Sequence, residues 1–403
     1  MSGSQVKNHA GGYGPQGWVH WPEHEEKSFN FVRVLASAPE GACTVGEAFL
    51  AGSRIDPADD ESWHVEWTKI ADVSLARAEQ ALADGHRETA RANFLRAANY
   101  YRSAEYFMPH TDAAGRTDPN RLAAFDKVEA ASHQYLKLMK PAGEIVRIPF
   151  EDSYLDAYFV RSPYAVAPYP VVICFGGSDE YKDELLHEMP RHAFPRGLSL
   201  LLVDLPGQGG SLRRRGLYAR SDTEKPVGAC VDYLVSRPDV DTDRIALYGA
   251  SLGGYYAPRA ASFEHRLACV VSDGAIWNRL ADRDFLKEFY RAAPNSLNVR
   301  QLMFLTGSAN WDETMDVVGK FRLDGVIDTI SCPYLVVHGE QDFLGVDIAE
   351  NSVAYAKSKG VDVTYKLFTS AETGAAHCQM DNPTLGQEYI CDWIADRLGI
   401  QYD

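Results

Sequence analysis

The sequence has no long hydrophobic run, no signal-like beginning and no excess of positive charge. No stretch reaches the roughly 18 apolar residues that a membrane-spanning helix needs, so we expect no membrane partner. Residues 1–17 lack the apolar core of a secretory signal, which predicts a cytoplasmic protein, and the stretch Gly11–Gly17 predicts a mobile end. Lys and Arg number 40 against 56 Asp and Glu, and this net charge of −16 argues against nucleic acid as a partner.

Motifs for disulfides, metals and nucleotides are also missing. The seven cysteines are scattered without a Cys-x-x-Cys pair, so we expect reduced and mostly buried thiols. No cluster of candidate ligands indicates a metal site. The stretch Gly207-x-Gly209 lacks the lysine that a nucleotide cradle requires. We therefore expect a protein that works without metal or cofactor.

The first third of the chain has the apolar periodicity of helices. Thr44 and Glu47 form a capping-box pattern, and apolar side chains then recur every three to four residues in three longer segments. Because the 403 residues exceed one typical domain, we predict a helical N-terminal cap domain over residues 1–142. The three helices are predicted from about Ser62 to Ala83, Arg87 to Phe107 and Pro119 to Leu138.

Beyond Pro141 the pattern changes to short β-branched runs that alternate with helical segments. This alternation predicts a mostly parallel sheet with helices on both faces, an α/β fold for residues 143–403. A helical stretch at about 277–330 is longer than a simple crossover and predicts an insertion that roofs the site. The predicted strands are Glu144–Pro149, Leu155–Arg161, Pro170–Phe175, Ser199–Asp204, Arg244–Tyr248, Ala268–Ser272, Tyr334–His338 and Val363–Phe368.

The most informative motif is Gly249-Ala250-Ser251-Leu252-Gly253, between an apolar strand and a helical segment. Its small residues allow a tight turn that presents the Ser251 hydroxyl, as in a nucleophile elbow. The N–H groups after the turn lie at a helix N-terminus, where they can stabilise an oxyanion. We therefore predict Ser251 as a catalytic nucleophile and the Leu252 N–H as an oxyanion donor. A plain strand-to-helix turn is the alternative.

A serine hydroxyl needs a histidine to accept its proton and an acid to orient that histidine. In α/β-hydrolases these residues follow one another along the chain as serine, acid and histidine. Asp342 follows the strand that ends at His338, and we predict it as the acid, with Glu340 and Asp347 as alternatives. His377 lies in a small-residue loop after the last strand and is the predicted general base. We expect His338 to be a structural histidine beneath the acid loop.

Paired glycines follow the third predicted strand, in the run Gly176-Gly177-Ser178-Asp179-Glu180. They allow backbone N–H groups to approach a developing oxyanion, and the sequence leaves open whether Gly177 or Ser178 supplies that donor. The segment Asp204–Ser211, after the fourth strand, is expected to be a structural turn only.

These motifs together resemble one branch of the α/β-hydrolases. The resemblance rests on the helical N-terminal region, Phe-Gly-Gly after the third strand, Gly-x-Ser-x-Gly-Gly-Tyr-Tyr-Ala-x-Arg-Ala-Ala around Ser251 and the terminal Gly-Ala-Ala-His-Cys. That branch contains 2,6-dihydroxypseudooxynicotine hydrolase, the polyketide-shortening hydrolases of fungal pigment pathways and the fermentation–respiration switch protein. The resemblance spans nearly the whole chain. It implies the α/β-hydrolase fold, with a mostly parallel eight-stranded sheet and an N-terminal helical cap.

The resemblance also implies a small aromatic or polyketide-derived ketone as substrate, bound between the cap and the carboxyl edge of the sheet. Asp179, Tyr255, Tyr256 and Trp277 are the residues expected to contact it. Asp179 stands where the pyridine-ring hydrolase would have a glutamate, so the alternative role for Asp179 is that of a solvated structural carboxylate. For the two tyrosines the alternative role is core packing. Arg259 is expected to brace its helix by an ion pair. A homodimer through the cap is a further expected partner.

We therefore expect a serine hydrolase that cleaves a carbon–carbon bond next to a carbonyl, a retro-Claisen reaction. Ser251 would add to the ketone, and the leaving carbanion would take a proton from His377 or from an acid beside the oxyanion loop. An esterase, thioesterase or lactonase, and a cyclase that transfers the acyl group internally, are alternatives that need the same triad. A regulatory binding protein without catalysis is the alternative from another class.

Overall fold

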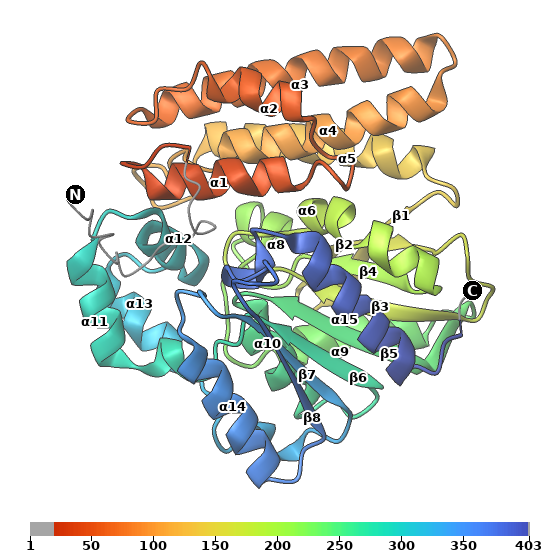
Figure 1. Cartoon of the computed structure of the whole chain (residues 1–403), viewed down its shortest axis with the longest axis vertical. Helices are drawn as coiled ribbons and strands as arrows, with labels where there is room; N and C mark the ends of the chain where they lie inside the picture. Colours follow the sequence, from red (N-terminus) through yellow and green to blue (C-terminus); the bar gives the residue numbers. More distant parts are fainter. Residues whose placement is uncertain (1–19, 402–403) are drawn as a thin grey trace.

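The computed structural model describes residues 20–401, so the stretch Gly11–Gly17 lies outside the described residues. Figure 1 shows a group of N-terminal helices (red to orange) stacked on one side of a sheet with its own flanking helices. Among the described residues, no helix combines the length and the apolar character that crossing a bilayer requires. All seven cysteines lie in this part of the chain, and they are buried and free, as the sequence predicts.

In the described part of the chain, five helices precede the first strand, and buried aromatic side chains fill the space between them. Thr44 accepts a hydrogen bond from the Glu47 N–H at 3.3 Å, which confirms Thr44 as the N-cap, but the Thr44 N–H donates to the Tyr100 hydroxyl at 2.9 Å, so the capping box is not closed. The three predicted helices are present. The five helices are α1 (Glu25–Ala36), α2 (Val45–Gly52), α3 (Asp60–Ala83), α4 (Arg87–Glu105) and α5 (Pro119–Leu138).

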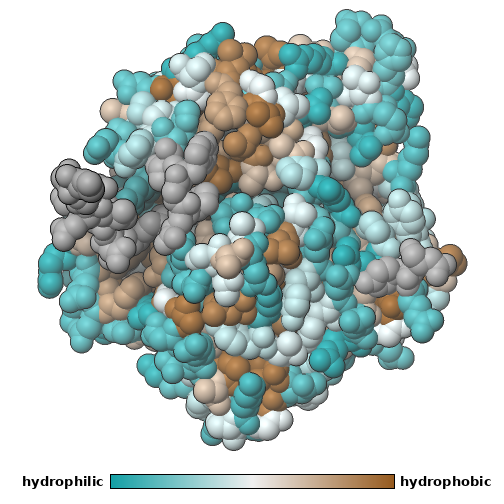
Figure 2. Space-filling view, in the orientation of Figure 1, coloured by the Kyte–Doolittle hydropathy of each residue, from teal (hydrophilic) through white to brown (hydrophobic). Residues whose placement is uncertain are grey.

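Helix α1 was not predicted from the sequence. Its buried face carries polar side chains, among them Lys27, Asn30 and Arg33, and these interrupt the apolar periodicity on which the prediction depends. On the face shown in Figure 2, hydrophobic side chains gather over the N-terminal helices, and Val45 and Phe49 of α2 are exposed.

The described residues form one eight-stranded sheet with the order β1-β2-β4-β3-β5-β6-β7-β8. β2 pairs antiparallel with β1 and β4, and the remaining pairs are parallel. This is the α/β-hydrolase fold that the sequence predicts. The strands are β1 (Glu144–Phe150), β2 (Ser153–Val160), β3 (Tyr169–Phe175), β4 (Ser199–Val203), β5 (Val240–Ala250), β6 (Cys269–Asp273), β7 (Tyr334–Gly339) and β8 (Val363–Phe368).

Helices cover both faces of this sheet. Apolar side chains of α9, α10 and α14, with those of α12 and α13, pack on one face, and side chains of α6, α7 and α15 pack on the other. Because β3, β5, β6 and β7 are parallel, their carboxyl ends meet at one edge, where α/β folds bind ligands. These helices are α6 (Lys182–Glu188), α7 (Pro190–Ala193), α8 (Gly209–Arg213), α9 (Glu224–Val235), α10 (Gly253–Ala261), α11 (Arg283–Ala292), α12 (Leu297–Thr306), α13 (Trp311–Val318), α14 (Val346–Ser358) and α15 (Pro383–Arg397).

Candidate active site

Ser251 stands in the sharp turn between β5 and α10. Its φ of +54° is left-handed, a conformation that costs energy for any residue with a side chain. The turn is held by two backbone hydrogen bonds of 2.7 Å, from the Ser251 N–H to the Asp273 carbonyl and from the Gly254 N–H to the Ser251 carbonyl. The backbone therefore lifts the Ser251 side chain out of the strand, as a nucleophile elbow requires.

The glycines around Ser251 have no room for a side chain. A Cβ at Gly249 would lie 2.3 Å from the Gly253 carbonyl oxygen, and one at Gly254 would lie 2.5 Å from the Gly274 carbonyl oxygen. These contacts are with backbone atoms, which cannot turn aside as a flexible side chain can. The Gly-x-Ser-x-Gly-Gly motif thus reflects the close packing of the elbow against its neighbouring strands.

The structure brings Ser251, His377 and Asp342 together from three separate loops. His377 Nε2 lies 2.8 Å from Ser251 Oγ, and His377 Nδ1 lies 2.8 Å from Asp342 Oδ2. Asp342 is buried, and its Oδ1 accepts the Leu344 N–H at 2.9 Å. In this arrangement the imidazole can accept the serine proton while the carboxylate fixes the orientation of the ring.

Carboxylates around His377 set its pKa. Burial alone would lower the pKa of His377, but the charge and hydrogen bond of Asp342, with the charges of Asp273 and Asp179, raise it above its ordinary value. Burial would raise the pKa of Asp342, but His377 outweighs burial and lowers it. Asp342 is therefore ionised at neutral pH and stabilises a protonated His377.

The alternative acids have other partners. Glu340 accepts hydrogen bonds of 2.7 Å from the N–H and hydroxyl of Ser370 at the surface. Asp347 is exposed and lies 3.6 Å from Arg279. His338 is fully buried, with Nδ1 3.6 Å from Asp342 Oδ2, which places it beneath the acid loop as expected.

The loop after β3 brings Gly177 against the nucleophile. A Cβ at Gly177 would lie 2.5 Å from Ser251 Cβ and 2.9 Å from Ser251 Oγ, so only glycine lets this loop come so close. Leu252 follows the nucleophile at the N-cap of α10. The two segments predicted to supply oxyanion donors therefore both adjoin Ser251.

Asp179 is half-buried and lies in an ion pair, which corrects the alternative of a freely solvated carboxylate. Its Oδ2 accepts hydrogen bonds from Arg33 Nη1 at 2.6 Å and from the Tyr106 hydroxyl at 2.7 Å. Burial would raise the pKa of Asp179, but Arg33 and Tyr106 outweigh it and hold the pKa at about 2. An ionised Asp179 has no proton to give, so the expectation that an acid beside the oxyanion loop protonates the leaving group does not hold for Asp179.

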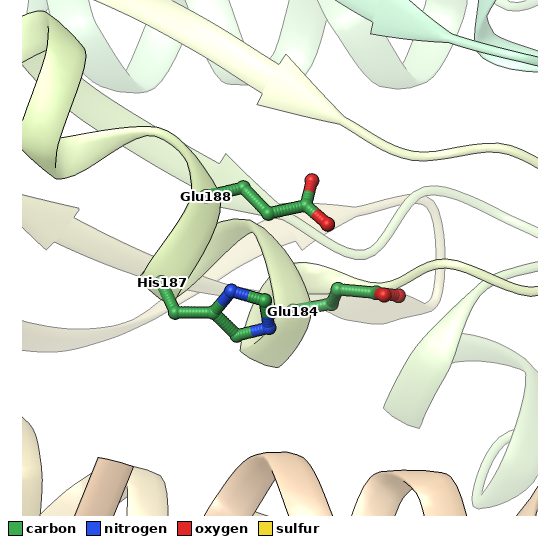
Figure 3. A group of neighbouring side chains, drawn as sticks. All are labelled: Glu184, His187 and Glu188. Carbon is green, nitrogen blue, oxygen red and sulfur yellow. The ribbon is translucent and has the colours of Figure 1, made fainter. Parts of the chain in front are cut away.

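Glu184, His187 and Glu188 lie together on α6, the first two buried and Glu188 half-buried (Figure 3). Their potential ligand atoms lie within 4.8 Å of one another. Glu184, however, already accepts hydrogen bonds from Arg33 at 2.7 and 2.5 Å and an ion pair from Arg102 at 3.0 Å. Two buried guanidinium groups would repel a metal cation, so this cluster gives no support to a metal site.

The neighbouring Glu180 has a buried side chain. Burial together with the charge of Glu184 raises the pKa of Glu180 to about 7. Burial and the charge of Glu180 raise the pKa of Glu188 well above its ordinary value. The Glu180–Glu188 pair therefore keeps a proton at neutral pH, which reduces the negative charge next to Asp179 and Glu184.

Tyr255 and Tyr256 lie in the core behind the nucleophile, which corrects their expected place in a substrate pocket. Both rings are buried. Tyr255 stacks on Phe321 with 4.8 Å between ring centroids, and its hydroxyl donates to the Ser221 carbonyl at 3.0 Å. The core-packing alternative describes these two side chains.

Trp277 and Arg259 also have structural contacts. Trp277 is half-buried at a φ of +48°, and its ring lies 5.1 Å from that of Tyr355. Arg259 forms a bidentate pair with Glu224, with both N–O distances 2.9 Å, which confirms the ion pair predicted to brace α10.

Two residues near the triad were missed in the sequence. The ring of Phe343 lies 4.6 Å from the ring of His377. Asp273 ends β6, is buried, and accepts the Tyr248 hydroxyl at 3.1 Å, and burial raises its pKa to about 6. The one available signal for Asp273 is its position directly after a predicted strand, because strand ends form this edge of the sheet.

Family models and similar sequences both place the chain among hydrolases. A model described as "Esterase FrsA-like" matches residues 58–296, and one of the prolyl oligopeptidase family matches residues 220–400. The chain is 31% identical over 356 residues to hydrolase acrC of Aspergillus aculeatus, which covers 78% of this chain and 82% of that protein.

Two further fungal proteins match over less of their length. Hydrolyase poxO of Penicillium oxalicum is 37% identical over 254 residues, covering 61% of this chain and 60% of poxO. The 20-hydroxy-prefusarin hydrolase FUS2 of Gibberella moniliformis is 34% identical over 260 residues, covering 62% of this chain and 60% of FUS2. The matched region thus spans less than two thirds of either relative.

Solved structures show the same fold over most of the chain. The crystal structure of 2,6-dihydroxy-pseudo-oxynicotine hydrolase superposes with a TM-score of 0.75 at 21% identity, covering 90% of this chain and 95% of that one. AbyA5 superposes with a TM-score of 0.65 at 19% identity, covering 89% and 95%.

Proposed function

Because the chain belongs to the FrsA-like esterase family of α/β-hydrolases, we propose that it is a serine hydrolase with Ser251, His377 and Asp342 as its catalytic triad. The observation that carries this proposal is the unbroken line of two 2.8 Å contacts from the Ser251 hydroxyl through His377 to Asp342. A hydroxyl, an imidazole and a buried carboxylate in this order are the groups that acyl transfer needs.

The proposed first step is attack of Ser251 Oγ on the substrate carbonyl carbon while His377 Nε2 takes the hydroxyl proton. The carbonyl oxygen becomes an oxyanion, which the N–H groups of Leu252 and of the Gly177–Ser178 segment stabilise. The tetrahedral intermediate then collapses, the bond to the leaving group breaks, and protonated His377 returns its proton to that group. Water, activated by His377, finally hydrolyses the acyl-Ser251 ester to a carboxylic acid.

For the bond that breaks, we propose a carbon–carbon bond beside a ketone in a small aromatic or polyketide-derived molecule. Its leaving group is a carbanion, which must be delocalised by a second carbonyl or a hydroxylated ring and must be protonated as it departs. Since Asp179 is held ionised, His377 is the proton donor. Its raised pKa suits that task, because a protonated His377 then keeps its proton until the leaving group forms.

Similarity supports a hydrolytic reaction. The relatives acrC and poxO are named as a hydrolase and a hydrolyase of filamentous fungi, and FUS2 is named as a hydrolase of 20-hydroxy-prefusarin. The triad and backbone donors need neither metal nor cofactor for the steps above.

Ester hydrolysis is the second candidate, and the description of the matching family as esterase-like favours it. The same nucleophile and oxyanion donors can cleave an ester bond or a carbon–carbon bond. The two reactions differ only in the stability of the leaving group. An aryl ester releases a phenolate, which needs no protonation by the enzyme.

The test compares 1-phenyl-1,3-butanedione with 4-nitrophenyl acetate as substrates, with Ser251→Ala as the control variant. We expect both to be cleaved, the diketone to a ketone and a carboxylic acid, and neither to be cleaved by Ser251→Ala. Turnover of the ester alone would show that the chain is an esterase. With ¹⁸O-labelled water, hydrolysis places label in the product acid, and a product without label would show internal acyl transfer.

A further inference from the structure

Three successive carbonyls of the loop after β3 are held by two glutamine side chains. Gln208 Nε2 donates to the Gly176 carbonyl at 2.5 Å and to the Gly177 carbonyl at 3.0 Å. Gln301 Nε2 donates to the Ser178 carbonyl. Gln208 comes from the turn after β4 and Gln301 from α12, so the loop is held by segments far from it in sequence.

The two bonds from Gln208 determine where the neighbouring N–H groups point. In a planar trans peptide the C=O and the following N–H point in opposite directions. Because the carbonyls of Gly176 and Gly177 converge on one nitrogen, the N–H groups of Gly177 and Ser178 are turned together to the other side. Successive N–H groups that face one way form an anion-binding nest.

This pair of N–H groups adjoins the nucleophile. The Gly177 Cα is so close to Ser251 that a Cβ there would lie 2.9 Å from Ser251 Oγ. We propose that Gln208 is a positioning residue of the oxyanion hole, which aims the Gly177 and Ser178 N–H groups at the developing oxyanion. This inference rests on the proposed serine hydrolase function. The turn after β4, which the sequence predicts to be structural only, would then contribute to catalysis through Gln208.

The amide of Gln208 can take only one orientation. The side chain is buried, and its Oε1 accepts the Leu205 N–H at 3.1 Å. A flipped amide would set an oxygen against two carbonyl oxygens and a nitrogen against an N–H, losing three hydrogen bonds. Gln208 Nε2 therefore stays directed at the loop after β3.

Asp204 fixes the turn that presents Gln208. Its Oδ1 accepts the Lys182 N–H and its Oδ2 accepts the Gly210 N–H, both at 2.9 Å. A Cβ at Gly209 would lie 1.9 Å from Asp204 Oδ2, so this position has no room for a side chain. Asp204 thus ties the turn of Gln208 to the chain that leaves the oxyanion loop.

Gln301 also donates to a carbonyl of this loop, but its effect on the oxyanion donors should be weaker than that of Gln208. It holds the Ser178 carbonyl, whose peptide partner is the Asp179 N–H, and so it does not orient the Gly177 and Ser178 donors. Its Oε1 lies 2.7 Å from His110 Nε2. Burial and the charge of Arg121 lower the pKa of His110 well below its ordinary value, so the ring is neutral and can donate this bond.

The test uses Gln208→Met, which keeps the length without a donor, and Gln208→Glu, which keeps the acceptor for the Leu205 N–H. With 4-nitrophenyl acetate we expect kcat to fall about 10²-fold in both, the usual loss for one oxyanion donor, with KM within about threefold. Binding of an aryl trifluoromethyl ketone, whose adduct with Ser251 carries an oxyanion, should weaken by a similar factor. Gln301→Met should lower kcat less than about tenfold.

Asn99→Leu is the control for loss of a buried amide. Asn99 Nδ2 donates to Ser37 Oγ at 2.9 Å and to the Ala42 carbonyl at 3.2 Å, within the N-terminal helices. We expect this variant to have a lower Tm with kcat unchanged. Values of kcat are normalised to the amount of enzyme that reacts with a fluorophosphonate, so a partly unfolded sample does not imitate the effect.

The inference is wrong if either Gln208 variant keeps kcat and ketone affinity within about threefold of the parent. It is also wrong if kcat falls only in proportion to the folded fraction, since that is what a structural role alone predicts. A parent protein that neither cleaves the ester nor reacts with the fluorophosphonate would instead contradict the proposed function.

Discussion

Two loops meet at Ser251, and they are held in place in different ways. The elbow after β5 is fixed by its own glycines and by backbone bonds to adjacent strands. The loop after β3 is fixed by side chains from distant segments, namely Arg33, Tyr106, Gln208 and Gln301. The nucleophile is thus positioned by a local motif, whereas the groups that stabilise the oxyanion are positioned by the tertiary structure.

The largest effect should come from the elbow itself. Ser251→Ala removes the nucleophile without changing the turn, and we expect kcat to fall by about 10⁴- to 10⁶-fold. Thermal unfolding should stay close to that of the parent protein, since the side chain makes no packing contact that alanine lacks. Steady-state kinetics on the aryl ester measures the fall, and a variant that retains more than about a hundredth of the activity would remove Ser251 from the mechanism.

The next effect concerns the distant anchors of the loop after β3. Arg33→Met removes the arginine that pairs with Asp179 and one of the two buried arginines that pair with Glu184, so Asp179 loses its ion pair and Glu184 keeps only Arg102. Breaking a buried pair in this way costs about 3–5 kcal/mol of unfolding free energy. Urea denaturation measures the loss. Arg191→Met, which removes an exposed partner of Glu40, is the control and should cost less than about 1 kcal/mol.

An equal loss in the two arginine variants would mean that Arg33 does not anchor the loop. The comparison of the two loops would then rest on Gln208 and Gln301 alone.

Gly177→Ala tests the point where the two loops touch. The new Cβ would lie 2.5 Å from Ser251 Cβ, so the loop must retreat from the nucleophile. We expect kcat to fall by about 10²- to 10³-fold as the oxyanion donors move away, with a small change in KM. Gly46→Ala, in α2 with no atom within 4 Å of the added Cβ, is the control, and it should raise the Tm slightly without changing kcat.

Normal kcat in Gly177→Ala would contradict the close approach of the two loops. Because the displaced loop also lowers the Tm, kcat is normalised to the amount of folded enzyme, which separates a loss of positioning from a loss of folding.

The smallest effect is a shift of the pH profile. His377 must be neutral to accept the serine proton, so kcat/KM should fall as the pH drops through its raised pKa. Asp273 has a pKa of about 6 and is therefore ionised above that pH, where its charge raises the pKa of His377. Asp273→Asn should move the acidic limb to lower pH by less than about one unit.

The exposed Asp347→Asn should leave the pH profile unchanged. A shift of the limb to higher pH in Asp273→Asn would contradict the electrostatic role given to Asp273.

The sequence predicted the features that depend on neighbours along the chain. Strand patterning, the elbow and the chain order of the triad led to the eight strands and to Ser251, Asp342 and His377. Arg33 could not be found, because it breaks the periodicity of its helix and its partners lie more than a hundred residues away. Gln208 could not be found either, since a turn sequence does not show which carbonyl its side chain reaches.

The predicted pocket role of Tyr255 failed for a related reason. Helical periodicity places its side chain on one face of α10, but only the fold shows that this face packs on Phe321 in the core. Asp179 was read as an exposed or active acid, because the arginine that ionises it comes from a helix that was not predicted.

The most direct test of the account is reaction of the folded protein with a fluorophosphonate, followed by intact-mass and peptide analysis. We expect the mass of one phosphonyl group on the peptide that carries Ser251. His377→Ala should react far more slowly, because the hydroxyl then lacks its base. A folded parent protein that stays unlabelled at neutral pH, or that is labelled at a residue other than Ser251, would contradict the assignment of Ser251 as the nucleophile.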